Sequence, residues 1–238
     1  MQNNELKKMC YRHIRQIIIL FAVINPLFLF CWVIISNFAS WSIFLAVFIL
    51  FVQAVSSLYA CLNMKDVHNW LYYETYIWFQ FSLIFLLLGF SGFVSKIPQW
   101  YVGYLFILFY VVSYLPWYKF LKKVWYSTYD ANIKSGKFDL TRGYYSIIHQ
   151  PAVYKFKNKV VNEWLGVMVA NSAIIIGISA YYGIMVNRRA NNPEYVLGVG
   201  AIVAAFLIAF VVTEKYINLK WVIKWEKENH KKMQTAYL

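Results

Sequence analysis

A polar stretch in the second half of the chain has the residue types of a calcium-binding loop. Asp130, Asn132 and Gly136 supply the carboxylate, the amide oxygen and the tight turn that such a loop needs. The glycine comes one position late, however, and the acidic residue expected at the end of the loop is absent. We therefore interpret residues 130–139 as a turn, with Asp139 as a helix cap, and predict no metal site.

Arg142 and His149 are the next residues with catalytic potential. Six residues separate them, a spacing that resembles the arginine and histidine of the HEPN ribonuclease family. One match of two residue types in a chain of 238 residues is a weak signal. Because His149 has no nearby cysteine and no Ser, His and Asp arrangement is legible, we predict a protein without catalytic residues or a cofactor.

Glu74 is the acidic residue to consider inside an apolar stretch, where an ionisable side chain is costly. One hypothesis combines it with His68 or His149 in an enzyme that modifies or transports lipids. The simpler interpretation is that a basic neighbour such as Lys65 or His68 neutralises Glu74. The sequence shows no chain of carboxylates at mid-membrane positions, so a proton or ion pump is not predicted.

The composition places these residues in a membrane protein. Hydrophobic residues make up 61% of the chain and charged residues only 14%, with a mean hydropathy of +0.50. Soluble domains contain about 45–50% hydrophobic residues and about 25% charged residues. Six apolar stretches reach the roughly 20 residues that a membrane-spanning helix needs. They cover residues 17–36, 42–62, 70–93, 99–118, 164–186 and 194–213. We expect an all-α polytopic membrane protein with about six transmembrane helices.

The distribution of lysine and arginine predicts how these helices are oriented. On the model of six spans, one side of the membrane receives nearly all basic residues, and the other receives only Lys96, Arg188 and Arg189. Basic loops stay on the cytoplasmic side, so both termini should be cytoplasmic. The net charge of +13 is therefore first a signal of orientation, and nucleic acid is not an expected partner. We expect a multi-pass protein of a bacterial inner membrane.

Four regions follow from this arrangement. Residues 1–118 form a membrane part with four helices, and residues 119–163 form a basic cytoplasmic insertion. Residues 164–213 form a hairpin of the last two spans, and residues 214–238 form a basic, amphipathic cytoplasmic tail. The sixth helix either continues into the cytoplasm or turns onto the membrane surface.

Small residues follow one face of each helix in the expected hairpin. They are Gly166, Ala170, Ala173, Gly177 and Ala180 in the first helix, and Gly198, Ala201 and Ala205 in the second. Small residues let helices approach closely in lipid, so the two helices should pack together, and part of the surface could face other copies or other proteins. A terminal hairpin of this kind after a long cytoplasmic segment resembles, in architecture alone, the MotA and ExbB class of stator subunits, with a different order of segments.

Basic and aromatic residues alternate in the two cytoplasmic regions. The insertion contains Lys122, Lys123, Trp125, Lys155 and Lys157, and the tail contains Trp221 and Trp225. This mixture is typical of a surface that contacts anionic lipid headgroups or an acidic partner protein.

The sequence thus favours a non-enzymatic integral membrane subunit. We expect it to oligomerise or to assemble with other membrane subunits into a larger complex of the secretion or conjugation type. The alternative from a different class is a homo-oligomeric channel or membrane effector, for example in phage defence. A lipid-modifying enzyme or a transporter is the third hypothesis.

Overall fold

A computed structural model describes residues 2–36, 39–63, 66–94, 108, 110–112, 114–115, 117–123, 138–146 and 193–235. Four long helices lie within these ranges: α1 (Gln2–Ile35), α2 (Ser40–Leu62), α3 (Val67–Val94) and α6 (Pro193–Asn229). Helical residues 110–112, 114–115 and 117–123 form a shorter piece that we call the 110–123 segment. The described chain is therefore mostly helical, as the sequence predicts.

Each long helix contains a stretch that is long and apolar enough to cross a membrane. These stretches are Arg12–Ile34, Ser40–Leu62, Val67–Ser91 and Gly200–Asn229. They confirm the predicted class, a helical membrane protein with several spans. Of the remaining two expected spans, residues 99–118 are described only in part and residues 164–186 lie outside the described residues, so the count of six stays a prediction.

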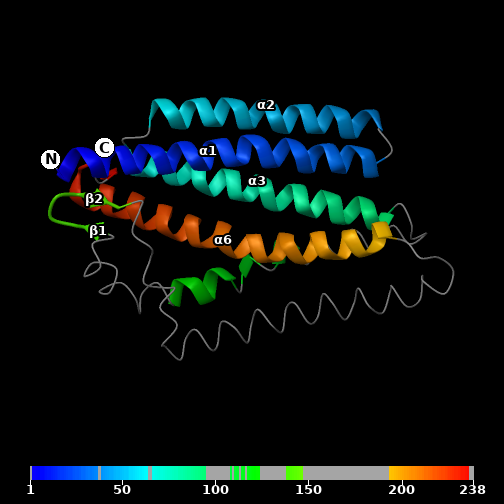
Figure 1. Cartoon of the computed structure of the whole chain (residues 1–238). Coiled ribbons are helices and arrows are strands. Elements are labelled where there is room, and N and C mark those ends of the chain that lie inside the picture. The colour runs from blue at the N-terminus through cyan, green and yellow to red at the C-terminus, as the bar shows by residue number, and fades with distance from the viewer. Residues whose placement is uncertain are drawn as a thin grey trace.

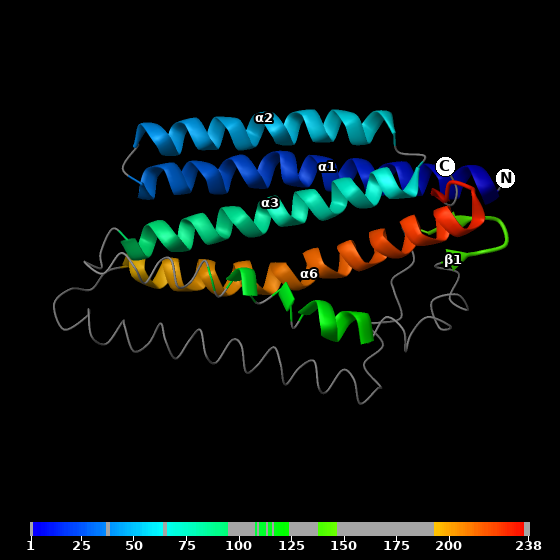
Figure 2. The same ribbon diagram turned by 180° about the vertical axis from the view of Figure 1, so that it is seen from behind.

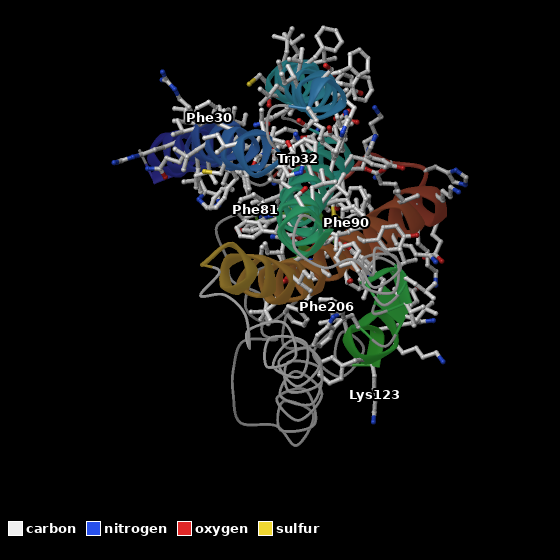
Figure 3. All side chains as sticks on the ribbon, turned by 90° about the vertical axis from the view of Figure 1, so that its right-hand side faces the viewer. Phe30, Trp32, Phe81, Phe90, Lys123 and Phe206 are labelled. Atoms are coloured by element: carbon white, nitrogen blue, oxygen red, sulfur yellow. The ribbon has the colours of Figure 1, made fainter. Side chains whose placement is uncertain are left out.

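The four long helices lie side by side in the order α2, α1, α3 and α6, as seen from both sides of the molecule (Figures 1 and 2). Helix α3 is the central element, since it contacts α1, α2 and α6. Its most extensive contact is with α6. Viewed along the helix axes, α3 lies between the other three helices (Figure 3).

A glycine explains how closely α3 approaches α6. A Cβ atom at Gly89 would collide with the side chain of Ile202 and would lie 3.0 Å from the carbonyl oxygen of Gly198. The backbone of α3 at Gly89 therefore lies close to the α6 backbone at Gly198 and directly against the side chain of Ile202. In a membrane, where apolar side chains gain little by leaving lipid, such close contact is a main source of helix association.

Helix α2 contacts the rest of the bundle through one narrow face. Its buried residues are Ser42, Ala46, Ile49, Gln53 and Ala60, which recur at spacings of three, four and seven residues. The other faces carry large, exposed apolar side chains, and Phe30 of the neighbouring α1 likewise points away from the bundle (Figure 3). A surface of this composition suits contact with acyl chains.

An aromatic cluster fills the space between α1 and α3. The ring of Phe21 lies 5.0 Å from that of Trp78 and 5.5 Å from that of Phe81, both in edge-to-face geometry. Phe85 extends the cluster, with ring distances of 4.9 Å to Phe81 and 4.7 Å to Phe28. Edge-to-face pairs add about 0.5–1.5 kcal/mol each beyond burial of their area. This cluster fixes α3, which carries half of the site described below.

A small sheet modifies the expectation of a purely helical protein. Strands β1 (Phe138–Asp139) and β2 (Tyr144–Tyr145) pair antiparallel, and β3 (Gln234–Thr235) pairs parallel with β2. The turn between β1 and β2 needs Gly143, whose φ is +72°. Asp139 caps this turn and not a helix, because its carboxylate accepts hydrogen bonds from Thr141 Oγ1 at 2.6 Å and from the Arg142 N–H at 3.1 Å.

Helix α6 begins where the sixth span was expected but continues well beyond it. It has 37 residues, which at about 1.5 Å per residue is roughly 55 Å, whereas the hydrocarbon layer is about 30 Å thick. Its last turns lie beside the sheet, at the end of the bundle where α1 begins (Figure 1). We call this end the basic end, because it carries Lys220, Lys224, Lys227, Lys231 and Lys232.

Candidate functional site

An ion pair joins the two helices that form the site. Glu74 Oε1 on α3 lies 2.9 Å from Lys215 Nζ on α6, and the Glu74 side chain is only 9% exposed. The sequence suggested Lys65 or His68 as the partner of Glu74. The actual partner comes from a helix that is distant in sequence, and Glu214 beside it is buried as well. The pair fixes the position of α6 relative to α3.

Further polar contacts tie the C-terminal tail to the start of α3. Lys232 Nζ lies 2.9 Å from Asp66 Oδ2, and His68 Nδ1 lies 3.2 Å from Glu226 Oε2. The other oxygen of Glu226 accepts a hydrogen bond of 2.8 Å from the Met233 N–H. Glu74 and His68, which one hypothesis joined in one catalytic site, thus have different partners.

A cavity of about 620 Å³ lies between α3, α6 and the 110–123 segment. We call it the tyrosine cavity, because five tyrosine side chains line it together with mostly apolar residues. The lining residues are Tyr72, Thr75, Tyr76, Phe79, Tyr114, Leu115, Tyr118, Val212, Thr213, Tyr216, Leu219, Lys220 and Ile223. Its volume is in the range of about 300–1,000 Å³ that small-molecule sites have.

A chain of hydroxyl groups holds one wall of the tyrosine cavity in place. Ser82 Oγ of α3 donates to the carbonyl oxygen of Ala205 on α6 at 2.8 Å. The Tyr110 hydroxyl lies 2.6 Å from Ser82 Oγ and 2.6 Å from the Tyr114 hydroxyl. The 110–123 segment is thereby attached to both long helices, and the ring of Tyr114 has a defined position at the cavity.

A second cavity of about 570 Å³ adjoins the first on the side of the basic end. We call it the lysine cavity. It shares Tyr118, Lys220 and Ile223 with the tyrosine cavity. Lys122, Ile217, Trp221, Lys224, Lys227 and Glu228 complete its lining. With four lysines and one glutamate, this lining carries a formal charge of +3.

Lys220 lies at the junction of the two cavities. Its Nζ donates a hydrogen bond of 3.4 Å to the Tyr118 hydroxyl and lies 5.7 Å from the centre of that ring. Lys224 pairs with Glu228 at 3.6 Å, but both side chains are well exposed, so the pair contributes little and exchanges readily. The arrangement can recognise a molecule that is apolar at one end and anionic at the other.

A separate polar cluster lies between α1, α2 and α3. Gln53 Oε1 accepts hydrogen bonds from Asn25 Nδ2 at 3.2 Å and from Gln80 Nε2 at 3.3 Å. Gln53 Nε2 donates to the carbonyl oxygen of Phe21 at 2.9 Å, and Gln80 Nε2 also donates to that of Ile49 at 3.2 Å. These hydrogen bonds join three helices, which is a structural use of polar groups in a membrane, although Asn25 Oδ1 and Gln80 Oε1 are buried and accept no hydrogen bond from the described residues.

The small-residue face is described for only one of the two helices. Gly198, Ala201 and Ala205 are buried, and the contacts of Gly198 and Ala205 are with Gly89 and Ser82 of α3. Residues Gly166, Ala170, Ala173, Gly177 and Ala180 lie outside the described residues. Whether this face also serves an oligomer is therefore still a prediction.

The basic and aromatic residues singled out in the sequence are distributed over several elements. Lys122 and Lys123 are exposed on the 110–123 segment, and Figure 3 shows Lys123 pointing away from the bundle. Trp221 packs on Phe138 with a ring distance of 4.4 Å, and Trp225 lies against Gly143. Both tryptophans thus hold the sheet against α6. Trp125, Lys155 and Lys157 lie outside the described residues, as do Asp130, Asn132, Gly136 and His149.

The sequence did not indicate Tyr118 as a site residue, and it placed Lys215 and Lys220 only among the lysines of the amphipathic tail. One signal was available for the lysines, because Lys220, Lys224 and Lys227 recur at spacings of four and three residues and so share a face of a helix. No comparable signal shows that this face meets Tyr118.

Comparison with known proteins gives no assignment. No protein-family model matches the chain, and neither a curated protein nor a solved structure is detectably similar to it. Within the described ranges, no three His, Cys, Asp or Glu side chains are grouped so as to hold a metal ion.

Proposed function

We propose that the protein is a non-enzymatic subunit of a larger membrane assembly of the secretion or conjugation type. The proposal includes six transmembrane helices, both termini in the cytoplasm, and a location in a bacterial inner membrane. The observation that carries it is the way the basic end is tied together. Elements from three distant parts of the sequence, the start of α3, the β1–β2 hairpin and the tail, meet there.

Backbone hydrogen bonds make this end a connected unit. The Val67 N–H donates to the Met233 carbonyl oxygen at 3.1 Å, and the Gln234 N–H donates to the Gly143 carbonyl oxygen at 2.9 Å. Chain ends are usually mobile unless something ties them down. A tail that is fixed by backbone pairing and by the Lys232–Asp66 ion pair gives a partner a preorganised surface, which lowers the entropic cost of binding.

The use of polar groups inside the bundle also supports a structural role. The amides of Asn25, Gln53 and Gln80 form hydrogen bonds between helices, and the charges of Glu74 and Lys215 form an ion pair between helices. Such contacts stabilise a defined arrangement of helices. A fixed arrangement is what a subunit needs in order to present the same surface to each partner.

The test is purification from native membranes in mild detergent, followed by native mass measurement and identification of co-purifying proteins. We expect a large species that contains unrelated subunits. The double variant Lys232→Ala and Glu226→Gln loosens the tail. Fewer partner subunits should co-purify with it than with the wild type, from membranes that contain the same amount of each protein. Lys231→Ala is the control, since that exposed lysine is the neighbour of Lys232.

Two other results would contradict the proposal. A species that contains only copies of this chain would favour the homo-oligomeric channel or effector, and ion flux in liposomes would then be measured. A monomer that brings down no other protein would leave the small-residue faces with a role in packing within the chain.

A further inference from the structure

We propose that the tyrosine cavity and the lysine cavity together bind one anionic glycerophospholipid. An acyl chain occupies the tyrosine cavity, and the headgroup phosphate lies among Lys122, Lys220 and Lys224. This inference does not depend on the proposed role in an assembly. It rests on the order in which apolar and basic residues follow one another along α6 and the 110–123 segment.

Two walls of the cavities show the same order. On α6 the lining changes from Val212 and Leu219 to the lysines as the helix runs toward the basic end. On the 110–123 segment it changes from Leu115 to Lys122 in the same direction, and α3 contributes Phe79 on the apolar side. Because the walls agree, the site has one apolar end and one basic end aligned with the bundle.

The position of this change matches the expected edge of the membrane. The sequence predicts that the fourth span ends at Tyr118, and Tyr118 lines both cavities. On this prediction Leu115 lies in the hydrocarbon layer, and Lys122 lies beyond it. A lipid bound in the site would therefore keep the orientation that it has in the bilayer, with its chain inward and its headgroup at the surface.

The chemistry of the two cavities selects an anionic phospholipid over simpler ligands. A purely apolar molecule would leave the lysines unused, and a small soluble anion would leave the tyrosine cavity unfilled. A lysine ammonium is a compact charge suited to phosphate. Anionic lipids are enriched in the cytoplasmic leaflet, the side on which the lysine-rich end is expected to lie.

Two features prepare the basic end of the site. The hydrogen bond of Lys220 to Tyr118 holds that ammonium at the junction between the cavities, so its side chain is already positioned before a lipid arrives. The exposed Lys224–Glu228 pair is weak, so Lys224 can turn to a phosphate at little cost. Each basic side chain near an anionic lipid surface adds a factor of about five in affinity.

The experiment uses the full chain in detergent and measures bound lipid by native mass measurement during titration with dioleoyl phosphatidylglycerol or dioleoyl phosphatidylcholine. We expect about one bound phosphatidylglycerol per chain. The affinity for phosphatidylglycerol should exceed that for phosphatidylcholine by at least about tenfold, because each lysine near the headgroup favours the anionic lipid. The triple variant Lys122→Gln, Lys220→Gln and Lys224→Gln should lose most of this preference. The matched control Arg12→Gln, Arg15→Gln and Lys119→Gln removes the same charge elsewhere and should keep it.

A second pair of variants tests the acyl chain. Leu115→Trp narrows the tyrosine cavity and should reduce binding of both lipids, whereas Leu108→Trp replaces an exposed leucine of the same region that does not line the cavity. The thermal unfolding midpoint of each variant shows whether it is folded. Three results would overturn the proposal. The wild type could bind the two lipids equally, the two triple variants could lose the preference for phosphatidylglycerol equally, or glycerol phosphate alone could displace all of the bound lipid. Failure to find partner subunits would not affect it.

Discussion

Glu74 Oε1 on α3 and Lys215 Nζ on α6 lie 2.9 Å apart, in a part of the bundle where the Glu74 side chain is 9% exposed and that of Lys215 is 22% exposed. The two helices also approach closely at Gly89. One contact is ionic and the other is steric, and each can be tested separately. Both determine how α6 sits on α3, and with it the shape of the tyrosine cavity.

Removal of one partner of the ion pair should destabilise the protein strongly. Lys215→Met leaves the Glu74 carboxylate buried without its counter-charge, which typically costs about 3 kcal/mol or more. We expect a clear fall in the thermal unfolding midpoint in detergent, followed by tryptophan fluorescence. The double variant Glu74→Gln and Lys215→Met should recover most of the loss, because no uncompensated charge is left.

The exposed pair of Lys224 and Glu228 provides the control for this experiment. Lys224→Met should change the unfolding midpoint very little, because an exposed ion pair contributes at most about 1 kcal/mol. If Lys215→Met were as mild as Lys224→Met, the pairing of α3 with α6 through Glu74 would be wrong.

A methyl group at Gly89 should separate α3 from α6. Gly89→Ala places a Cβ against the side chain of Ile202, and overpacking of this kind costs about 1–3 kcal/mol. In the background Ile202→Ala the same substitution should cost less, which a double-mutant cycle measures. Gly200→Ala is the matched control on α6, since a Cβ there meets nothing within 4 Å. Equal effects at the two glycines would contradict the close approach.

Loss of the central amide should weaken the contact among α1, α2 and α3. Gln53→Leu removes the oxygen that serves both Asn25 and Gln80, and hydrogen bonds between membrane helices contribute about 0.6–2 kcal/mol. We expect a lower unfolding midpoint. Ser56→Ala removes only a bond to a carbonyl of its own helix and should be milder. A Gln53→Leu variant more stable than the wild type would mean that the cluster does not hold the helices together.

The β1–β2 turn should respond to acid. Hydrogen bonds from Thr141 Oγ1 and from the Arg142 N–H hold the pKa of Asp139 below its ordinary range. Because the folded pKa is lower than the unfolded one, this carboxylate stabilises the fold above about pH 4, and the contribution is lost as the pH falls through the folded pKa. The unfolding midpoints of the wild type and Asp139→Asn should therefore differ at neutral pH and converge in acid. In the Thr141→Val background, Asp139→Asn should change the unfolding midpoint less at neutral pH than it does in the wild type. An effect of Asp139→Asn that is independent of pH would refute this role of Asp139.

The long helices were predictable from the sequence because uninterrupted apolar stretches have few other solutions in a membrane. The expected stretch 42–62 agrees closely with α2 (Ser40–Leu62). The length of α6 was left open, since its basic half is amphipathic and fits either a helix in the cytoplasm or one on the membrane surface. The sheet was not predictable, because each of its strands has only two residues. A strand of that length is too short to show an alternation of apolar and polar residues.

Single residues of the site were predictable from the sequence, but their partners were not. The sequence identified Glu74 as a costly charge and Lys122 as part of a basic surface, but not that Glu74 pairs with Lys215 of α6 or that Lys122 lines a cavity with α6. Pairing between distant helices depends on how the helices are arranged, and hydropathy carries no information about that. Gly198 and Ala205 of the small-residue face contact Gly89 and Ser82 of α3, and nothing in the sequence indicated α3 as their partner.

The central position of α3 has a consequence for the biogenesis of the protein. Ser82 and Ala205, which touch in the finished bundle, are 123 residues apart in the chain. A helix that is made early must therefore wait in the membrane, with the Glu74 carboxylate unpaired, until α6 has been synthesised and inserted. Chains arrested before Lys215 would carry that unpaired carboxylate as a mark of incompleteness, so we expect them to be degraded while complete chains persist.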